Sequence, residues 1–140
     1  MMGTERRRIG IIGAGWVSGY HLPAWMRQSE RAEVVAIADP SPGAIEARLA
    51  AFDIARSYAS AQAMLDAEQL DAVDICAPRE FHVELVRLAA AKDLDIICQK
   101  PLAPSYGEAV DLLASLSGRG RLMIHENWRF RAYYRRLKAW

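Results

Sequence analysis

Short apolar runs alternate with segments of helical spacing along the chain. The runs are rich in β-branched residues and are bounded by turn residues, which is typical of strands buried on both faces of a parallel sheet. They predict five strands, over Arg8–Ile12, Val34–Ala38, Ala72–Ala77, Leu94–Cys98 and Arg121–His125.

The segments between these runs carry apolar residues three and four positions apart, as amphipathic helices do. Ser41 followed by Pro42 has the pattern of a helix start, and Ser105 with Glu108 forms a capping-box pattern. Helices are predicted near residues 17–28, 42–52, 64–70, 81–92 and 105–118, and residues 128–140 are compatible with one more.

Strands and helices in alternation indicate βαβ units with right-handed crossovers. The predicted fold class is therefore α/β: a doubly wound, mostly parallel sheet of the Rossmann type, in three layers (α/β/α). We assign residues 1–125 to this domain and residues 126–140 to a basic, aromatic C-terminal segment.

The composition is that of an ordinary globular chain, since 52% of the 140 residues are hydrophobic and 25% are charged. No apolar run approaches the roughly 20 residues that cross a bilayer, and no signal-peptide core follows the basic N-terminus. We therefore expect a cytoplasmic protein without membrane contact. Cys76 and Cys98 lie in separate apolar runs and in no CxxC pair, which favours buried thiols over a metal site.

The turn after the first predicted strand has the form of a dinucleotide fingerprint with one departure. Gly13 and Gly15 occupy the first two positions of G-x-G-x-x-G, where glycine permits a tight turn and lets the backbone approach a pyrophosphate at a helix N-terminus. Ser18 takes the third position, and Gly19 follows one residue late. The third glycine allows close packing of helix on strand, so a small serine weakens the motif without removing it.

Asp39 ends the second predicted strand, where a carboxylate can accept hydrogen bonds from the hydroxyls of an adenosine ribose. The same charge repels a 2′-phosphate, and residues 40–43 contain no arginine to offset it. The turn, its flanking strand and helix, and the terminal acid together predict a nucleotide site that prefers NAD to NADP.

Three further turns make the motif set more specific: APREFH at residues 77–82, CQKPL at 98–102 and HENWRF at 125–130. With the fingerprint and His21, they resemble the G-x-G-x-x-(G/A)-x-x-H, T-P-x-x-x-H and E-K-P motifs of the glucose–fructose oxidoreductase/inositol 2-dehydrogenase/MocA (Gfo/Idh/MocA) family of NAD(P)-dependent oxidoreductases. The resemblance runs from Ile9 to about Arg136. It implies the N-terminal Rossmann domain of an enzyme that takes a hydride from a sugar or polyol hydroxyl.

The resemblance also implies roles for individual residues. Lys100 is the catalytic candidate, because it matches a lysine that reaches the nicotinamide ribose and the substrate hydroxyl. The implied cofactor contacts are Gly13, Gly15, Trp16 and Val17 at the pyrophosphate, Asp39 at the adenosine ribose, and Ala77, Pro78, His82, Lys100 and Pro101 near the nicotinamide ribose. Pro101 matches a proline whose preceding peptide is often cis, and Asn127 and Arg129 are implied near the substrate cleft.

The chain departs from the family pattern beside the candidate lysine. Gln99 replaces the usual glutamate and removes one negative charge next to Lys100, and Ala77 stands where threonine is common. His21 and His125 are interpreted as packing or loop residues rather than as catalysts.

Family members are usually more than twice as long, and their second domain supplies most of the substrate pocket and an acid–base histidine. The resemblance therefore implies little or no activity for these residues alone, because hydride transfer needs a positioned alcohol and a proton acceptor. A non-catalytic NAD-binding or regulatory module remains open. So does a homo-oligomer that covers the surface where a second domain would sit, since exposed apolar patches favour association.

The C-terminal segment leaves one more alternative open. Cationic residues outnumber acids seven to one between residues 119 and 138, and aromatic residues are interleaved with them. That pattern also occurs in nucleic-acid-binding modules. We favour the simpler interpretation, in which these residues form the polar face of a docking helix.

Overall fold

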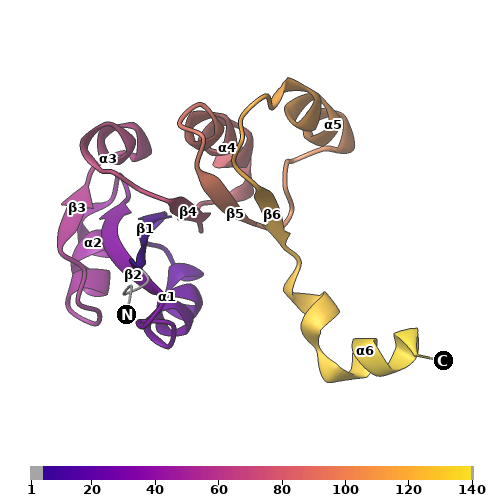
Figure 1. Ribbon diagram of the computed structural model, residues 1–140, viewed down its shortest axis with the longest axis horizontal. Helices are drawn as coiled ribbons and strands as arrows, with labels where there is room; N and C mark the ends of the chain where they lie inside the picture. Colours follow the sequence, from indigo (N-terminus) through magenta and orange to yellow (C-terminus); the bar gives the residue numbers. More distant parts are fainter. Residues whose placement is uncertain (1–4, 140) are drawn as a thin grey trace.

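The computed structural model describes residues 5–139. Within them a six-stranded sheet has the order β3-β2-β1-β4-β5-β6, and every neighbouring pair is parallel (Figure 1). The strands are β1 (Arg7–Ile12), β2 (Ala32–Ala38), β3 (Arg56–Tyr58), β4 (Ala72–Ile75), β5 (Asp95–Gln99) and β6 (Leu122–His125). The predicted Rossmann class is confirmed, and the strand order reverses at β1.

Helices cover both faces of the sheet. On one face lie α1 (Ser18–Met26) and α2 (Pro42–Leu49), and on the other lie α3 (Ala61–Ala67), α4 (His82–Ala90) and α5 (Tyr106–Ser115). A short 3-10 turn, η1 (Arg79–Phe81), precedes α4. A second one, η2 (Asn127–Phe130), connects β6 to α6 (Ala132–Lys138).

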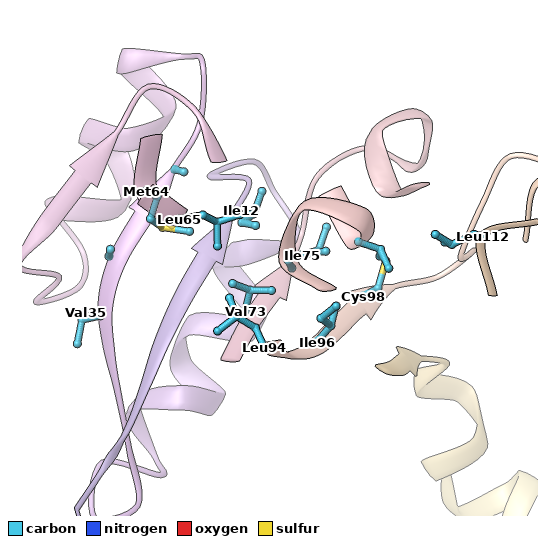
Figure 2. Close-up of a cluster of buried hydrophobic side chains, with 14 residues drawn as sticks. Ile12, Val35, Met64, Leu65, Val73, Ile75, Leu94, Ile96, Cys98 and Leu112 are labelled. Carbon is cyan, nitrogen blue, oxygen red and sulfur yellow. The ribbon is translucent and has the colours of Figure 1, made fainter. Parts of the chain in front are cut away.

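Alternation of side chains along the strands gives each face its own core. Figure 2 shows the larger core, in which Val73 and Ile75 of β4 lie with Ile96 and Cys98 of β5 beneath α3, α4 and α5. The smaller core lies under α1 and α2 and includes Leu22, which is fully buried.

The edge strand β3 is absent from the sequence-based expectation. It is the three-residue segment Arg56–Tyr58, and its side chains are exposed or half-buried. A short polar strand has no apolar run to mark it, because it lies at the edge of the sheet and pairs only with β2. Its backbone pairing, not its side chains, makes it a strand.

The helix starts follow their serine caps. Ser41 and Ser105 accept hydrogen bonds from the backbone N–H groups of Ala44 and Glu108, as predicted. The third helix begins at Ala61, earlier than the predicted residue 64, because Ser60 caps it. The fifth ends at Ser115, short of the predicted residue 118.

The α1 side of β4, β5 and β6 is only partly covered. Asp74, Ile97 and Met123 lie side by side across these three strands. Asp74 is buried against α1, Ile97 is half-buried and Met123 is 44% exposed. Beyond them the chain runs away from the sheet through η2 and α6 (Figure 1), so apolar sheet surface stays accessible on this side.

The C-terminal segment has no buried residue among those that the structure describes. Helix α6 is preceded by Trp128 and Phe130, which are 50% and 60% exposed, and Leu137 in the helix is 57% exposed. Among residues 5–139, no helix has the length and apolar character needed to cross a membrane.

Leu112 and Leu113 test which face of α5 holds the helix on the sheet. Leu112 is fully buried in the larger core, whereas Leu113 is 51% exposed. We expect Leu112→Ala to lower the free energy of unfolding by about 2–4 kcal/mol, because it leaves a cavity. Leu113→Ala should change it by less than about 0.5 kcal/mol. Chemical denaturation measures both, and equal losses would contradict the packing of α5.

Candidate functional site

The turn after β1 needs glycine at its first position. Gly13 has φ +101°, and a Cβ there would lie 2.7 Å from the backbone nitrogen of Ala77 in the turn after β4. Its N–H donates to the Ala38 carbonyl at the end of β2, at 2.8 Å. Gly15 differs, because a Cβ there would meet nothing within 4 Å. The backbone at Gly15 is therefore open to a bound molecule.

Helix α1 begins in this turn without a side-chain cap. Val17 occupies the cap position and provides no hydrogen bond, whereas serines cap α2, α3 and α5. Trp16 beside it is 75% exposed and contacts the Tyr20 ring edge to face, with 4.7 Å between centroids. The N–H groups of Gly19 and Tyr20 already donate to the Trp16 and Val17 carbonyls, so an anion here would bind the N–H groups of the turn that precedes them.

Asp39 is fastened to the glycine turn. Its Oδ2 accepts from the Ala14 N–H at 2.7 Å, and its Oδ1 accepts from the Ser41 N–H at 2.8 Å. A carboxylate has about four acceptor positions, so these two bonds leave capacity for further donors. The end of β2 thus places an acid directly beside the turn after β1.

A buried histidine joins the turns that follow β4 and β5. His82 is 1% exposed; its Nε2 lies 2.8 Å from the Ala77 carbonyl oxygen and its Nδ1 lies 2.6 Å from that of Pro101. Pro78 is exposed beside it. The Lys100–Pro101 peptide is cis, as the resemblance implies. The structure therefore brings the two predicted turns into one unit with His82 between them.

Lys100 is exposed at the end of β5, next to a glutamine that makes two contacts. The Gln99 Oε1 accepts from the Lys100 backbone N–H at 2.8 Å. The Gln99 Nε2 lies 3.2 Å from the His21 Nε2. The residue that replaces the family's glutamate thus connects the candidate lysine to α1.

His21 belongs to a buried polar cluster around Asp74. The Asp74 Oδ2 lies 2.8 Å from the His21 Nδ1 and accepts from the Trp25 Nε1 at 2.8 Å. With its proton on Nδ1, His21 donates to Asp74 and accepts at Nε2 from the Gln99 amide. His21 is therefore a buried, hydrogen-bonded residue of the cleft wall.

Cys76 adds a third type of metal ligand to this cluster. The nearest ligand atoms of His21, Asp74 and Cys76 all lie within 4.8 Å of one another. Burial and the neighbouring Asp74 carboxylate raise the pKa of the Cys76 thiol, whose Sγ lies 3.7 Å from the Asp74 Oδ1. Burial likewise raises the pKa of Cys98 to about 12. The geometry favours a hydrogen-bonded cluster.

A cleft of about 820 Å³ opens between α1 and the carboxyl ends of β5 and β6. Its lining includes Trp16 and Val17 of the glycine turn, Lys100, His125 and Asn127. The His125 Nδ1 and the Asn127 Oδ1 are buried without a hydrogen-bond partner among residues 5–139. Because neither atom is exposed, a molecule in the cleft would reach them only after these side chains move.

The two predicted substrate residues separate in the structure. Asn127 lines the cleft. Arg129 lies outside the described lining, with its guanidinium carbon 5.6 Å from the centroid of the Phe130 ring. Arg131, which the sequence analysis did not select, lines the cleft beside Trp128. No spacing rule distinguishes these two arginines, because the path of η2 decides which one faces the sheet.

Fold and site together define an oxidoreductase domain of the NAD-binding Rossmann type. Residues 7–126 match the family model described as "Oxidoreductase family, NAD-binding Rossmann fold". The chain therefore belongs to the Gfo/Idh/MocA oxidoreductase family.

Two relatives of this chain are a sugar dehydrogenase and a polyol dehydrogenase. The chain is 42% identical over 128 residues to a D-apiose dehydrogenase of Paraburkholderia graminis, covering 91% of this chain and 34% of that protein. It is 37% identical over 113 residues to an inositol 2-dehydrogenase of Leifsonia xyli, covering 81% of this chain and 33% of that protein. The chain thus spans about a third of the length of these two relatives.

Two solved oxidoreductase structures share the fold of this chain. An oxidoreductase from Agrobacterium radiobacter, in complex with NAD+, L-tartaric acid and magnesium, has a TM-score of 0.89 at 31% identity. The match covers 96% of this chain and 40% of that one. The WlbA dehydrogenase from Bordetella pertussis, in complex with NADH and UDP-GlcNAcA, has a TM-score of 0.89 at 26% identity, over 96% and 41% of the two chains.

The two glycines of the turn should differ in their effect on stability. Gly13→Ala places a Cβ against the Ala77 backbone at a positive φ, so we expect it to lower the free energy of unfolding by about 2–4 kcal/mol. Gly15→Ala meets open space and should change it by less than about 1 kcal/mol. Thermal and urea unfolding measure both, and a stable Gly13→Ala protein would refute the close approach of the two turns.

His125 should make stability depend on pH. Burial first and the nearby His21 second lower its pKa from the usual 6.5, although Asp74 and Glu126 act in the opposite direction. The folded state thus binds its proton less tightly than the unfolded chain, so stability falls as the pH drops from about 7 to 5. His125→Gln should make that part of the pH profile shallower. An unchanged slope would contradict this assignment.

Proposed function

We propose that the chain is the cofactor-binding part of a dehydrogenase that transfers a hydride between NAD and a hydroxyl of a sugar or polyol. The attachment of Asp39 to the glycine turn, 2.7 Å from the Ala14 nitrogen, carries this proposal. It places an acceptor for ribose hydroxyls beside a turn whose N–H groups can bind a pyrophosphate. The relatives' names supply the substrate class, D-apiose and inositol.

The cofactor would lie across the carboxyl ends of β1, β2 and β4, where the strand order reverses. Gly13 would shape the turn that holds the pyrophosphate, since its own N–H donates to the Ala38 carbonyl, and Gly15, Trp16 and Val17 would bind it through the backbone. Ala77, Pro78, His82, Lys100 and Pro101 would form the floor beneath the nicotinamide ribose. The contacts of His82 to Ala77 and Pro101 support this arrangement, because they fix both halves of that floor.

NAD is preferred to NADP in this proposal. Asp39 is negatively charged at neutral pH, and a 2′-phosphate on the ribose it binds would be repelled. The four residues that follow Asp39 are Pro40, Ser41, Pro42 and Gly43, none of which carries a compensating positive charge.

Bound NAD+ would supply the hydride acceptor, and the residues of the chain would hold the alcohol. The Lys100 ammonium can donate to the substrate oxygen and stabilise the alkoxide left when an acid–base group outside these residues takes the hydroxyl proton; the alkoxide then becomes a carbonyl as its carbon gives up the hydride. Asn127, which lines the cleft, would hold a second hydroxyl through its side-chain amide. Arg129 is the weaker substrate candidate, because it lies outside the described lining of the cleft.

We propose further that residues 1–125 act as the cofactor domain and that residues 126–140 lead toward whatever completes the substrate pocket. Little activity is expected from these residues alone, because the resemblance places the acid–base histidine in a second domain.

The exposed aromatic side chains of the C-terminal segment support self-association as a homodimer or a larger homo-oligomer. Analytical ultracentrifugation that detects only monomer at high concentration would refute the oligomer. The buried thiols of Cys76 and Cys98 fit a reducing cytoplasm.

Titration with NADH and NADPH tests the proposed function. Excitation of tryptophan, with Trp16 in the turn, should give energy transfer to NADH that saturates, and NADPH should bind more weakly. Asp39→Ala should weaken NADH binding about 10- to 100-fold, since it removes hydrogen bonds to a charged group, and it should narrow the preference over NADPH. Asp111→Ala, an exposed acid on α5, is the matched control and should leave the affinity unchanged.

Absence of binding to either nucleotide would contradict the proposal. Binding of a nucleic acid that falls steeply with salt, without NADH binding, would instead support the alternative based on the arginine-rich segment. An Asp39→Ala protein that binds NADH as well as the wild type does would remove Asp39 from the site.

A further inference from the structure

We propose that Arg48 is a positioning residue for the dinucleotide turn and that, together with Ser18, it replaces the third glycine of the fingerprint. This inference rests on the proposed NAD site and names a residue that no motif of the chain identifies. Arg48 lies in the last turn of α2, distant in sequence from the glycine turn, and is half-buried.

Arg48 binds the turn through three hydrogen bonds. Its Nε donates to the Ala14 carbonyl at 3.1 Å and to the Ser18 Oγ at 3.0 Å, and its Nη2 donates to the Gly15 carbonyl at 2.8 Å. Ser18 is fully buried and its hydroxyl donates to the same Gly15 carbonyl at 2.7 Å. A planar guanidinium presents its donors in a fixed fork, so these acceptors are held in one arrangement.

The late glycine of the motif makes room for this guanidinium. A Cβ on Gly19 would lie 3.1 Å from the Arg48 Nη1 and 3.3 Å from its Cζ. A Cβ there would push the end of the Arg48 side chain aside by a few tenths of an ångström, so glycine leaves the guanidinium its full space where it crosses α1, one residue beyond the usual third position. Ser18 at that third position becomes a ligand of the arginine, so the two departures from the fingerprint have a common cause.

Because peptide bonds are planar, the hydrogen bonds of Arg48 to the two carbonyls also set the direction of N–H groups on the proposed binding surface. In a trans peptide, the carbonyl of one residue and the N–H of the next point in opposite directions. When Arg48 holds the carbonyls of Ala14 and Gly15 on its own side, the N–H groups of Gly15 and Trp16 must point away from it. Those are N–H groups that the proposed pyrophosphate would use.

Asp39 acts on the preceding peptide in the same way. Its carboxylate holds the Ala14 N–H at 2.7 Å, and Arg48 holds the Ala14 carbonyl. Both residues belong to the β2–α2 unit, so this unit fixes three successive peptides of the turn. The arginine thereby orders a turn that would otherwise lose conformational entropy on binding a ligand.

Variants of Arg48 and its partners test the proposal by nucleotide affinity. Arg48→Met, which keeps the length and removes the donors, should weaken NADH and ADP-ribose about tenfold, while adenosine, which has no pyrophosphate, should change less than twofold. Arg48→Lys should recover part of the loss. Arg87→Met, an exposed arginine on α4, is the matched control and should bind like the wild type.

Two further variants separate positioning from folding. Gly19→Ala should not lower the thermal midpoint, because alanine favours a helix, yet it should weaken NADH several-fold by displacing the guanidinium. Ser18→Ala and Arg48→Met should be non-additive in NADH affinity, since both act on the Gly15 carbonyl.

The outcomes distinguish this inference from the proposed function. A wild-type chain that binds neither NADH nor ADP-ribose overturns the nucleotide site and the role of Arg48 with it. A wild-type chain that binds NADH, together with folded Arg48→Met and Gly19→Ala proteins of equal affinity, overturns only the role of Arg48. Equal losses for adenosine and ADP-ribose also overturn it, because they would indicate a general disturbance of the site.

Discussion

The turn after β1 passes so close to the turn after β4 that a single methyl group cannot enter between them, since a Cβ on Gly13 would lie 2.7 Å from the Ala77 nitrogen. Strand β1 lies between β2 and β4, and its end is bonded to both: Gly13 donates to the Ala38 carbonyl and Cys76 donates to that of Ile12. The start of α1 is therefore fixed relative to both neighbouring strands. The rest of the site depends on this constraint, because Asp39 lies on one side of the turn and Ala77, whose carbonyl His82 contacts, lies on the other.

A second constraint links this turn to the cleft through α1. The helix starts in the glycine turn and carries His21 and Trp25, which both bond to Asp74 on β4. A buried carboxylate needs such donors, since leaving it unsatisfied costs free energy. Gln99 then completes the chain from His21 to the Lys100 backbone. A glutamate at position 99 would offer only acceptors, whereas the glutamine amide also offers a donor beside the His21 Nε2.

The sequence predicted what local chemistry determines. Buried strands show as apolar runs, and Ser41 and Ser105 cap helices where the patterns place them. The fingerprint and Asp39 fall at neighbouring strand ends, because parallel strands end at one edge of a sheet. Strand β3 was not predicted, because its Arg-Ser-Tyr sequence is polar and only its pairing with β2 defines it. The role of Arg48 was also out of reach, since its acceptors lie 30 to 34 residues away and only the fold brings the end of α2 to the start of α1.

The two halves of the site differ in how completely residues 5–139 build them. On the cofactor side, Gly13, Asp39 and His82 are each held by hydrogen bonds to other strands and turns. On the substrate side, Met123 and Trp128 line the cleft but remain 44% and 50% exposed, and the His125 Nδ1 has no partner among the described residues. A binding surface that its own fold holds rigid can bind a ligand without help, whereas hydride transfer also needs an alcohol held against that ligand from the other side. In the proposed function, cofactor affinity and turnover are therefore separable, because the proposed cofactor site is the half that residues 5–139 build more completely.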